Sequence, residues 1–255
     1  MSGRNHLGMN RIVLAILIGL ALGQGAGARA ATVLIAGAGA GTEGDYNSGF
    51  PFNTSLFRGG SMRFQQVYGA NEFAALPGPQ YLTTIAFRAD GAYGEQFAAV
   101  ALDLRIDLST TPAGADGLSP TFADNIGPDR RTVLAGEITL SSAATAVAGG
   151  TRFFDIVLAL TDPFLFDPAR GNLLLDIRSY GTTTTTQMDA VNVRADGLSR
   201  VVAHDAYATV GAADTVGLVT QFTFQPQPVP LPPALCLLVP ALAVLAGLGR
   251  GRARR

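Results

Sequence analysis

Hydrophobic and polar residues alternate along the middle of the chain. In residues 100–108, Val, Leu or Ile occupies every second position, and Ala, Asp or Arg occupies the positions between. This period of two is typical of a β-strand with one buried and one solvent-exposed face. The same alternation recurs in residues 154–160, 173–177 and 218–224, and more weakly in residues 61–68, 82–89, 132–140 and 199–210. We therefore expect strands here, with Asp103, Asp107 and Asp176 on exposed faces.

Turn-forming residues separate these stretches. Asp, Asn, Gly and Pro gather in residues 89–91, 115–117, 125–128 and 167–172. A helical pattern is confined to residues 71–76, and the Gly/Ala-rich residues 31–48 are expected to be irregular. Many short strands joined by turns predict an all-β fold: a single antiparallel β-sandwich or jelly-roll-like domain over residues 31–225.

The amino end has the layout of an export signal. Two Arg residues come before or at the start of an apolar run over residues 12–22, and the small-x-small sequence Ala28-Arg29-Ala30 follows. Eleven helical residues span about 16 Å, which is too short for a hydrocarbon core of about 30 Å. We predict a signal peptide over residues 1–30, cut between Ala30 and Ala31. The alternative is an uncleaved membrane anchor.

The carboxyl end has three parts in sequence. A Pro-rich spacer over residues 226–233 precedes an apolar run that ends at Leu248, and the last six residues carry four Arg. From Pro233 to Leu248 a helix would be about 24 Å long, a marginal span that flanking Arg residues and bilayer thinning can accommodate. We predict a short transmembrane helix with an Arg-rich tail over residues 234–255. The basic cluster that should stay in the cytoplasm consists of Arg250, Arg252, Arg254 and Arg255.

This order resembles a known class of sorting signal, the PEP-CTERM tail, in the variant that reads V-P-L-P. The motif residues are Val229, Pro230, Leu231 and Pro232, and the resemblance covers residues 229–255. It departs from the usual pattern at Cys236, where Trp is common, and at Pro240. The resemblance implies a Gram-negative bacterium that makes extracellular polysaccharide, and processing of the tail by an exosortase in the inner membrane. The alternative is an ordinary carboxyl-terminal anchor.

Charge and composition exclude several functions. All 19 acidic residues and 11 of the 18 Arg lie in residues 31–225, which gives this region a net charge of −8. Nucleic-acid binding needs a basic face, so we expect no nucleic-acid partner. One Cys in 255 residues excludes a disulfide framework and a Cys-based metal site.

The search for catalytic and metal-binding residues gives little. His204 is the only His beyond residues 1–30, and it lies beside Asp205, so a secreted hydrolase would have to use it. No EF-hand-type loop is present, although the 15 Asp could include one Ca²⁺ site. The tetrapeptide Arg88-Ala-Asp-Gly91 recurs at residues 194–197, which we attribute to chance or to a shared turn preference. We expect no catalytic residue, no cofactor and no enzymatic activity.

The hypothesis that follows is an exported surface or matrix protein. Its tail would anchor it in the inner membrane until an exosortase processes it. It would then be displayed at the cell surface or outside the cell. An alternative is a carbohydrate-binding module for self-made extracellular polysaccharide.

Overall fold

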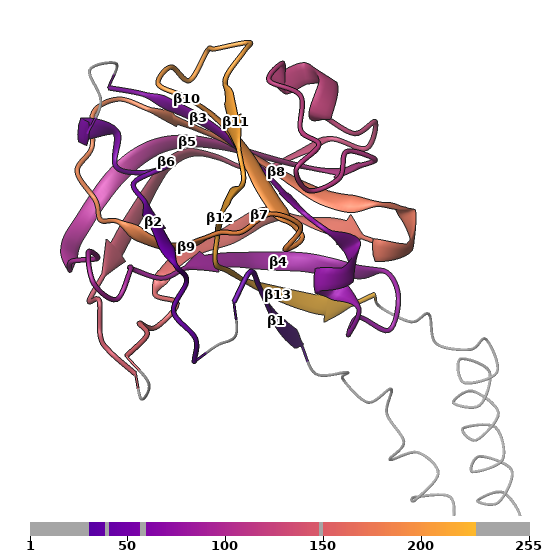
Figure 1. Cartoon of the computed structure of the whole chain (residues 1–255), viewed down its shortest axis with the longest axis horizontal. Helices are drawn as coiled ribbons and strands as arrows, with labels where there is room; N and C mark the ends of the chain where they lie inside the picture. The colour runs from indigo at the N-terminus through magenta and orange to yellow at the C-terminus, as the bar shows by residue number, and fades with distance from the viewer. Residues whose placement is uncertain (1–30, 39–40, 57–59, 148–149, 228–255) are drawn as a thin grey trace, which may run out of the picture. The chain divides into compact units, whose positions relative to one another are not determined.

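The computed structural model describes residues 31–38, 41–56, 60–147 and 150–227 (Figure 1). Within these residues every paired strand is antiparallel, and the helical segments are 3-10 turns of three or four residues. The predicted all-β antiparallel fold is thereby confirmed. The 3-10 turns are η1 (Thr54–Leu56), η2 (Ala70–Phe73), η3 (Phe122–Asn125) and η4 (Pro168–Arg170).

A four-stranded sheet joins the two ends of the described chain. Its strands, in spatial order, are β1 (Thr32–Ala36), β13 (Thr220–Pro226), β4 (Gln80–Phe87) and β7 (Ile156–Phe166). The first and last strands are direct neighbours, because Thr32 pairs with Phe224 and Ala36 with Thr220. The chain therefore enters and leaves this sheet at the same end.

Two further sheets complete the architecture (Figure 1). The six-stranded sheet has the order β11 (Ala212–Asp214), β10 (Leu198–Ala203), β3 (Met62–Tyr68), β8 (Asn172–Tyr180), β5 (Phe97–Thr111) and β6 (Arg131–Ser142). The three-stranded sheet has the order β12 (Val216–Leu218), β9 (Met188–Asn192) and β2 (Tyr46–Ser48). The side-chain amide of Gln66 on β3 ties the two together, since it accepts from the Leu218 N–H at 2.7 Å and donates to the Leu218 carbonyl at 3.0 Å.

One hydrophobic core is shared by all three sheets. On the four-stranded sheet, Phe222 and Ile85 face this core, as do Leu104 on the six-stranded sheet and Ala190 on the three-stranded sheet. Phe73 of η2 closes one end, with its ring centroid 4.9 Å from that of Phe166. The alternating apolar residues of the sequence thus become the inward rows of facing sheets.

A smaller second core covers the outer face of the six-stranded sheet at β10, β3 and β8. It joins side chains of the sheet to Leu118 and Phe122, which lie in the long connection between β5 and β6. This cover corrects the expectation that Asp176 faces solvent. Asp176 is buried, and its carboxylate accepts hydrogen bonds from Arg63 at 2.7 Å and from Gln65 at 2.8 Å.

Asp107 corrects the expectation of a row of solvated charges on β5. Asp103 is exposed as predicted, but Asp107 is only 4% exposed. Its carboxylate accepts from the Thr132 hydroxyl at 2.6 Å and pairs with Arg105 at 3.2 Å. Thr132 of β6 and Arg105 of the same strand therefore satisfy an acid that the alternation alone assigned to water.

Some strand boundaries also differ from the expectation. Residues 31–48, expected to be irregular, hold β1 and β2, whose partners β13 and β9 lie far along the sequence. The predicted strand over residues 199–210 ends at Ala203, and Phe154 lies before β7, which begins at Ile156.

The terminal predictions fall mostly outside the described residues. The signal peptide over residues 1–30, the remaining spacer from residue 228, and the membrane helix with its Arg cluster are all in this group. Pro226, assigned to the spacer, instead ends β13 and pairs with Gln80. In the part of the chain that the structure describes, no helix is long and apolar enough to cross a membrane.

Candidate functional site

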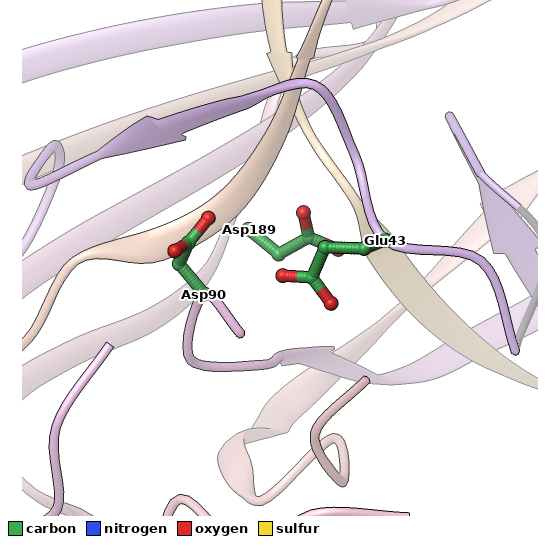
Figure 2. Close-up of side chains that lie close together, drawn as sticks. All are labelled: Glu43, Asp90 and Asp189. Carbon is green, nitrogen blue, oxygen red and sulfur yellow. The ribbon is translucent and has the colours of Figure 1, made fainter. Parts of the chain in front are cut away.

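Three carboxylates converge where β4 and β9 meet the connection between β1 and β2. Glu43 comes from that connection, Asp90 from the turn after β4, and Asp189 from β9 (Figure 2). Each residue offers one oxygen, and these three oxygens lie within 4.8 Å of one another. Among the described residues, this is the one acidic group close enough to share a cation.

A buried Arg balances part of this negative charge. Arg88 follows β4 directly, and its Nη2 lies 2.6 Å from Oδ2 of Asp189. Both side chains are fully buried, and the guanidinium carbon lies 4.9 Å from the ring centroid of Phe154. The backbone reinforces the contact, because the Asp189 N–H donates to the Arg88 carbonyl at 3.1 Å. The ion pair therefore links the end of β4 to β9.

Backbone N–H groups satisfy one carboxylate oxygen of each of the three acids. Oδ1 of Asp189 accepts from the Gly44 N–H at 2.9 Å, and Oε1 of Glu43 accepts from the Gly91 N–H. Oδ1 of Asp90 accepts from the N–H groups of the two residues after Gly91, at 2.9 and 2.6 Å. Oε2 of Glu43 is buried and has no hydrogen-bond partner. The cluster thus fastens two loops onto β9.

Glycine is required where the loop carrying Glu43 crosses β9. A Cβ at Gly44 would lie 2.0 Å from the Ala190 carbonyl oxygen and 2.7 Å from Oδ1 of Asp189. This close approach allows the Gly44 N–H to reach the Asp189 carboxylate.

Burial dominates the titration of the cluster. It raises the pKa of Asp189 from 3.8 to about 6, while the charge and hydrogen bonds of Arg88 oppose the shift and the charge of Glu43 adds to it. A carboxyl group with such a pKa suits proton transfer near neutral pH. The side chain of Asp189 is fully buried, however, so the arrangement does not present it to a substrate.

Carboxylates are the ligands that Ca²⁺ prefers, but a Ca²⁺ site needs six to eight oxygens. Here Arg88 already provides a positive charge, and backbone N–H groups occupy three of the carboxylate oxygens. The arrangement fits a structural clasp between loops, and the expectation that the protein has no cofactor stays a prediction.

The recurring tetrapeptide shows a shared turn preference. Asp90 accepts from the N–H two residues later, and Asp196 likewise accepts from the Leu198 N–H at 2.9 Å. The preceding Arg residues differ, because Arg88 is fully buried and Arg194 is exposed. The four letters therefore encode an Asx turn, and only the first copy contributes to the acidic cluster.

His204 lies in an exposed segment after β10, with its ring centroid 5.2 Å from that of Phe50. The carboxylate of Asp205 accepts from the Tyr207 N–H at 2.9 Å, as an Asx turn does. The neighbouring acid that the hydrolase hypothesis offered as a partner for His204 thus has a local structural role.

Of the predicted processing residues, the structure describes only Ala31, which immediately precedes β1. Ala28, Ala30, the motif Val229–Pro232 and the Arg cluster lie outside the described residues. Sequence reasoning had noted Asp90 only as a turn residue and had not singled out Glu43 or Asp189. Three segments far apart in the chain supply these acids, so no local spacing could signal their convergence.

Comparisons of the chain with protein-family models, with curated proteins and with solved structures give no match.

Proposed function

We propose that the chain is an exported, non-enzymatic surface or matrix protein whose carboxyl-terminal tail is a signal for exosortase processing. The observation that carries this proposal is the order of V-P-L-P, apolar run and Arg cluster at the end of the chain. Residues 229–255 resemble the PEP-CTERM tail of Gram-negative bacteria, and residues 1–30 have the layout of a signal peptide.

The positions of the domain ends support this proposal. The predicted new amino terminus, Ala31, directly precedes β1, and Gln227 directly follows β13. Thr32 and Phe224 are paired neighbours, so both processed segments would leave the domain at one end of one sheet. Cleavage beyond either end would leave every described strand intact. The six residues from Pro228 to Pro233 reach about 20 Å when extended, which would hold the domain close to the membrane.

The body of this protein would be a β-sandwich. Support comes from the shared core, in which Phe222 and Ile85 of the four-stranded sheet join Phe64 and Ile106 of the six-stranded sheet. A sandwich of this kind buries one face of each sheet against the other.

Replacing residues 229–232 by Gly-Ser-Gly-Ser tests the sorting claim. The chain would be expressed with an epitope tag inserted after Gly114, an exposed loop residue, in a bacterium that carries an exosortase. We expect the unaltered chain to lose the tail that follows the V-P-L-P motif and to reach the cell surface or the medium. The altered chain should keep its tail and remain in the membrane fraction, as intact-mass analysis would show.

The matched control replaces Ala241, Ala243 and Val244 by Leu, which makes residues 241–244 all Leu and preserves the apolar character of the tail. We expect this variant to mature like the unaltered chain. If the Gly-Ser variant also matures normally, the V-P-L-P motif is not the processing signal. If every variant keeps Arg255 in the membrane fraction, the tail is an ordinary anchor. Either result overturns the proposal.

A further inference from the structure

The outer face of the four-stranded sheet carries three cross-strand rows without a charged side chain. Strand register and alternation define the rows, and their members are Ile35, Gln221, Ala86 and Val157; Val33, Thr223, Thr84 and Ala159; and Gln225, Tyr81 and Leu165. We call these eleven residues the neutral face. The acidic residue of β7, Asp162, lies between two of the rows and pairs with Arg131 of β6.

This composition is unusual for the outer face of an antiparallel sheet, which is normally polar and charged where it meets water. Val33 is 53% exposed, Val157 46% and Leu165 40%. On the six-stranded sheet, by contrast, the second core under the β5–β6 connection covers the outer face of β10, β3 and β8, and the exposed part on β5 and β6 carries Asp103 and Glu137. The neutral face is therefore a partly exposed surface of apolar and uncharged hydrogen-bonding groups, on which Ala86 is buried and Val33, Val157 and Leu165 are exposed. Exposed apolar surface of this kind marks candidate interaction sites.

A groove continues the neutral face at one end. It has a volume of about 480 Å³, and Ile35 and Gln221 of the face form part of its lining. Phe153 and Phe154 also line it, and Phe153 is 55% exposed. Among the described residues that line the groove, one is charged: Arg152, which is half-buried and donates from Nη2 to the Gly91 carbonyl at 2.9 Å. The groove is large enough for a small-molecule-sized unit and offers an exposed aromatic ring beside an amide.

We propose that the neutral face and its groove bind an uncharged polysaccharide. This inference rests on the described domain and is independent of tail processing. Sugar units combine apolar C–H faces, which pack on rings such as those of Phe153 and Tyr81, with hydroxyl groups, which exchange hydrogen bonds with Gln and Thr side chains.

Charge selects the class of polymer. The domain over residues 31–225 carries a net charge of −8, so its field opposes a polyanion such as a polyuronate. The neutral face contributes no charge of its own, and an uncharged polymer loses no ionic hydration when it binds there. The aromatic residues lie at different points along the strands. Tyr81 pairs with Gln225 on β13, whereas the groove with Phe153 begins at Gln221, four residues earlier on the same strand and about 13 Å away. An extended chain of sugar units can span that length.

Affinity electrophoresis tests the proposal with full-length chain in a nonionic detergent. Native gels would contain hydroxyethylcellulose, galactomannan, laminarin or dextran as uncharged polymers, and alginate as the acidic comparison. We expect retardation by at least one uncharged polymer and none by alginate. Phe153→Ala should weaken the association by about tenfold, as loss of a ring contact implies. Thr223→Glu, which places a carboxylate in the central row, should also weaken it.

Tyr207→Ala is the matched control, because Tyr207 is 74% exposed and lies in the segment between β10 and β11, outside the neutral face. It should leave retardation unchanged. Circular dichroism of each variant would verify that the fold is intact. Retardation by none of the four uncharged polymers, or retardation that Phe153→Ala leaves unchanged, would overturn the proposal.

Hydroxyl-radical footprinting distinguishes the polymer from other occupants. We expect protection of Phe153, Tyr81 and Leu165 when the retarding polymer is added. Protection that instead appears with rising protein concentration alone would assign the face to a second copy of the chain. Protection that appears only with phosphatidylcholine vesicles would assign it to a lipid surface. Either of these results would refute polysaccharide binding.

Discussion

Replacing Arg88 by Met removes the positive charge from a cluster in which Asp90 and Asp189 are buried and Glu43 is half-buried. The side chains of Arg88 and Asp189 are both 0% exposed, and their charged atoms lie 2.6 Å apart. Glu43 and Asp90 each have a carboxylate oxygen within 4.8 Å of one on Asp189. Met retains much of the apolar volume beside Phe154 but leaves three acids near one another without a cation.

The expected loss of stability is large. Removing one partner of a buried ion pair costs 3–5 kcal/mol, and we take about 4 kcal/mol for Arg88→Met at pH 7. With a urea dependence of about 2 kcal/mol/M, the unfolding midpoint should fall by about 2 M. Because the chain has no Trp, far-ultraviolet circular dichroism is a suitable probe.

The opposite substitution should behave differently. Burial already raises the pKa of Asp189 to about 6, so the folded protein tolerates a neutral group at this position. Asp189→Asn leaves Arg88 buried without its carboxylate partner, so it should also destabilise the fold at pH 7, but by less than Arg88→Met does. Arg131→Met is the matched control, because Arg131 and Asp162 form an exposed pair with side chains 56% and 45% exposed. It should change stability by less than about 1 kcal/mol. If Arg88→Met shifts the midpoint no more than Arg131→Met does, the buried cluster does not hold the loops as argued.

The remaining predictions concern pH, the core and the chain end. Because the pKa of Asp189 is raised in the folded state, its contribution to stability is complete below pH 4 and is lost as pH rises towards 6. We therefore expect the unfolding free energy of the wild type, relative to that of Asp189→Asn, to be smaller at pH 7 than at pH 4. Phe222→Ala should cost about 3–5 kcal/mol, because its ring fills the shared core, whereas Thr223→Ala on the outer face should stay within about 0.5 kcal/mol in the same urea titration. A chain that ends at Gln227 should resist limited proteolysis like the whole domain, whereas one that ends at Val219 should be degraded, because it lacks β13 from the middle of its sheet.

The sequence predicted best those strands whose alternation is strong over many residues. Residues 100–108 lie within β5, and residues 218–224 largely coincide with β13. In both strands the inward apolar side chains produce a period of two that is visible in the local sequence. β1 and β2 show no such period. Their pairing depends on β13 and β9, about 190 and 140 residues away, and a short Gly- and Ala-rich segment shows no period of its own.

Charged residues were the least predictable part of the fold. The alternation correctly placed Asp176 on the outer side of β8, but it could not show that Phe122 and the β5–β6 connection cover that side. Arg63 and Gln65 then compensate the buried carboxylate. Periodicity assigns a side chain to one face of a strand, whereas a long connection elsewhere in the chain decides whether that face meets water.

The position of β13 links the fold to the proposed route of export. This strand lies between β1 and β4, and Phe222 and Phe224 complete the core, so the four-stranded sheet cannot close until residues 220–226 are available. The predicted apolar run begins eight residues after β13 ends. If the leader and tail act as proposed, the four-stranded sheet of the domain would stay incomplete throughout translocation, and the domain would finish folding only when its tail reaches the membrane. Pairing between the first and last strands is the kind of long-range contact that delays folding, which suits a chain that must cross a membrane before it folds.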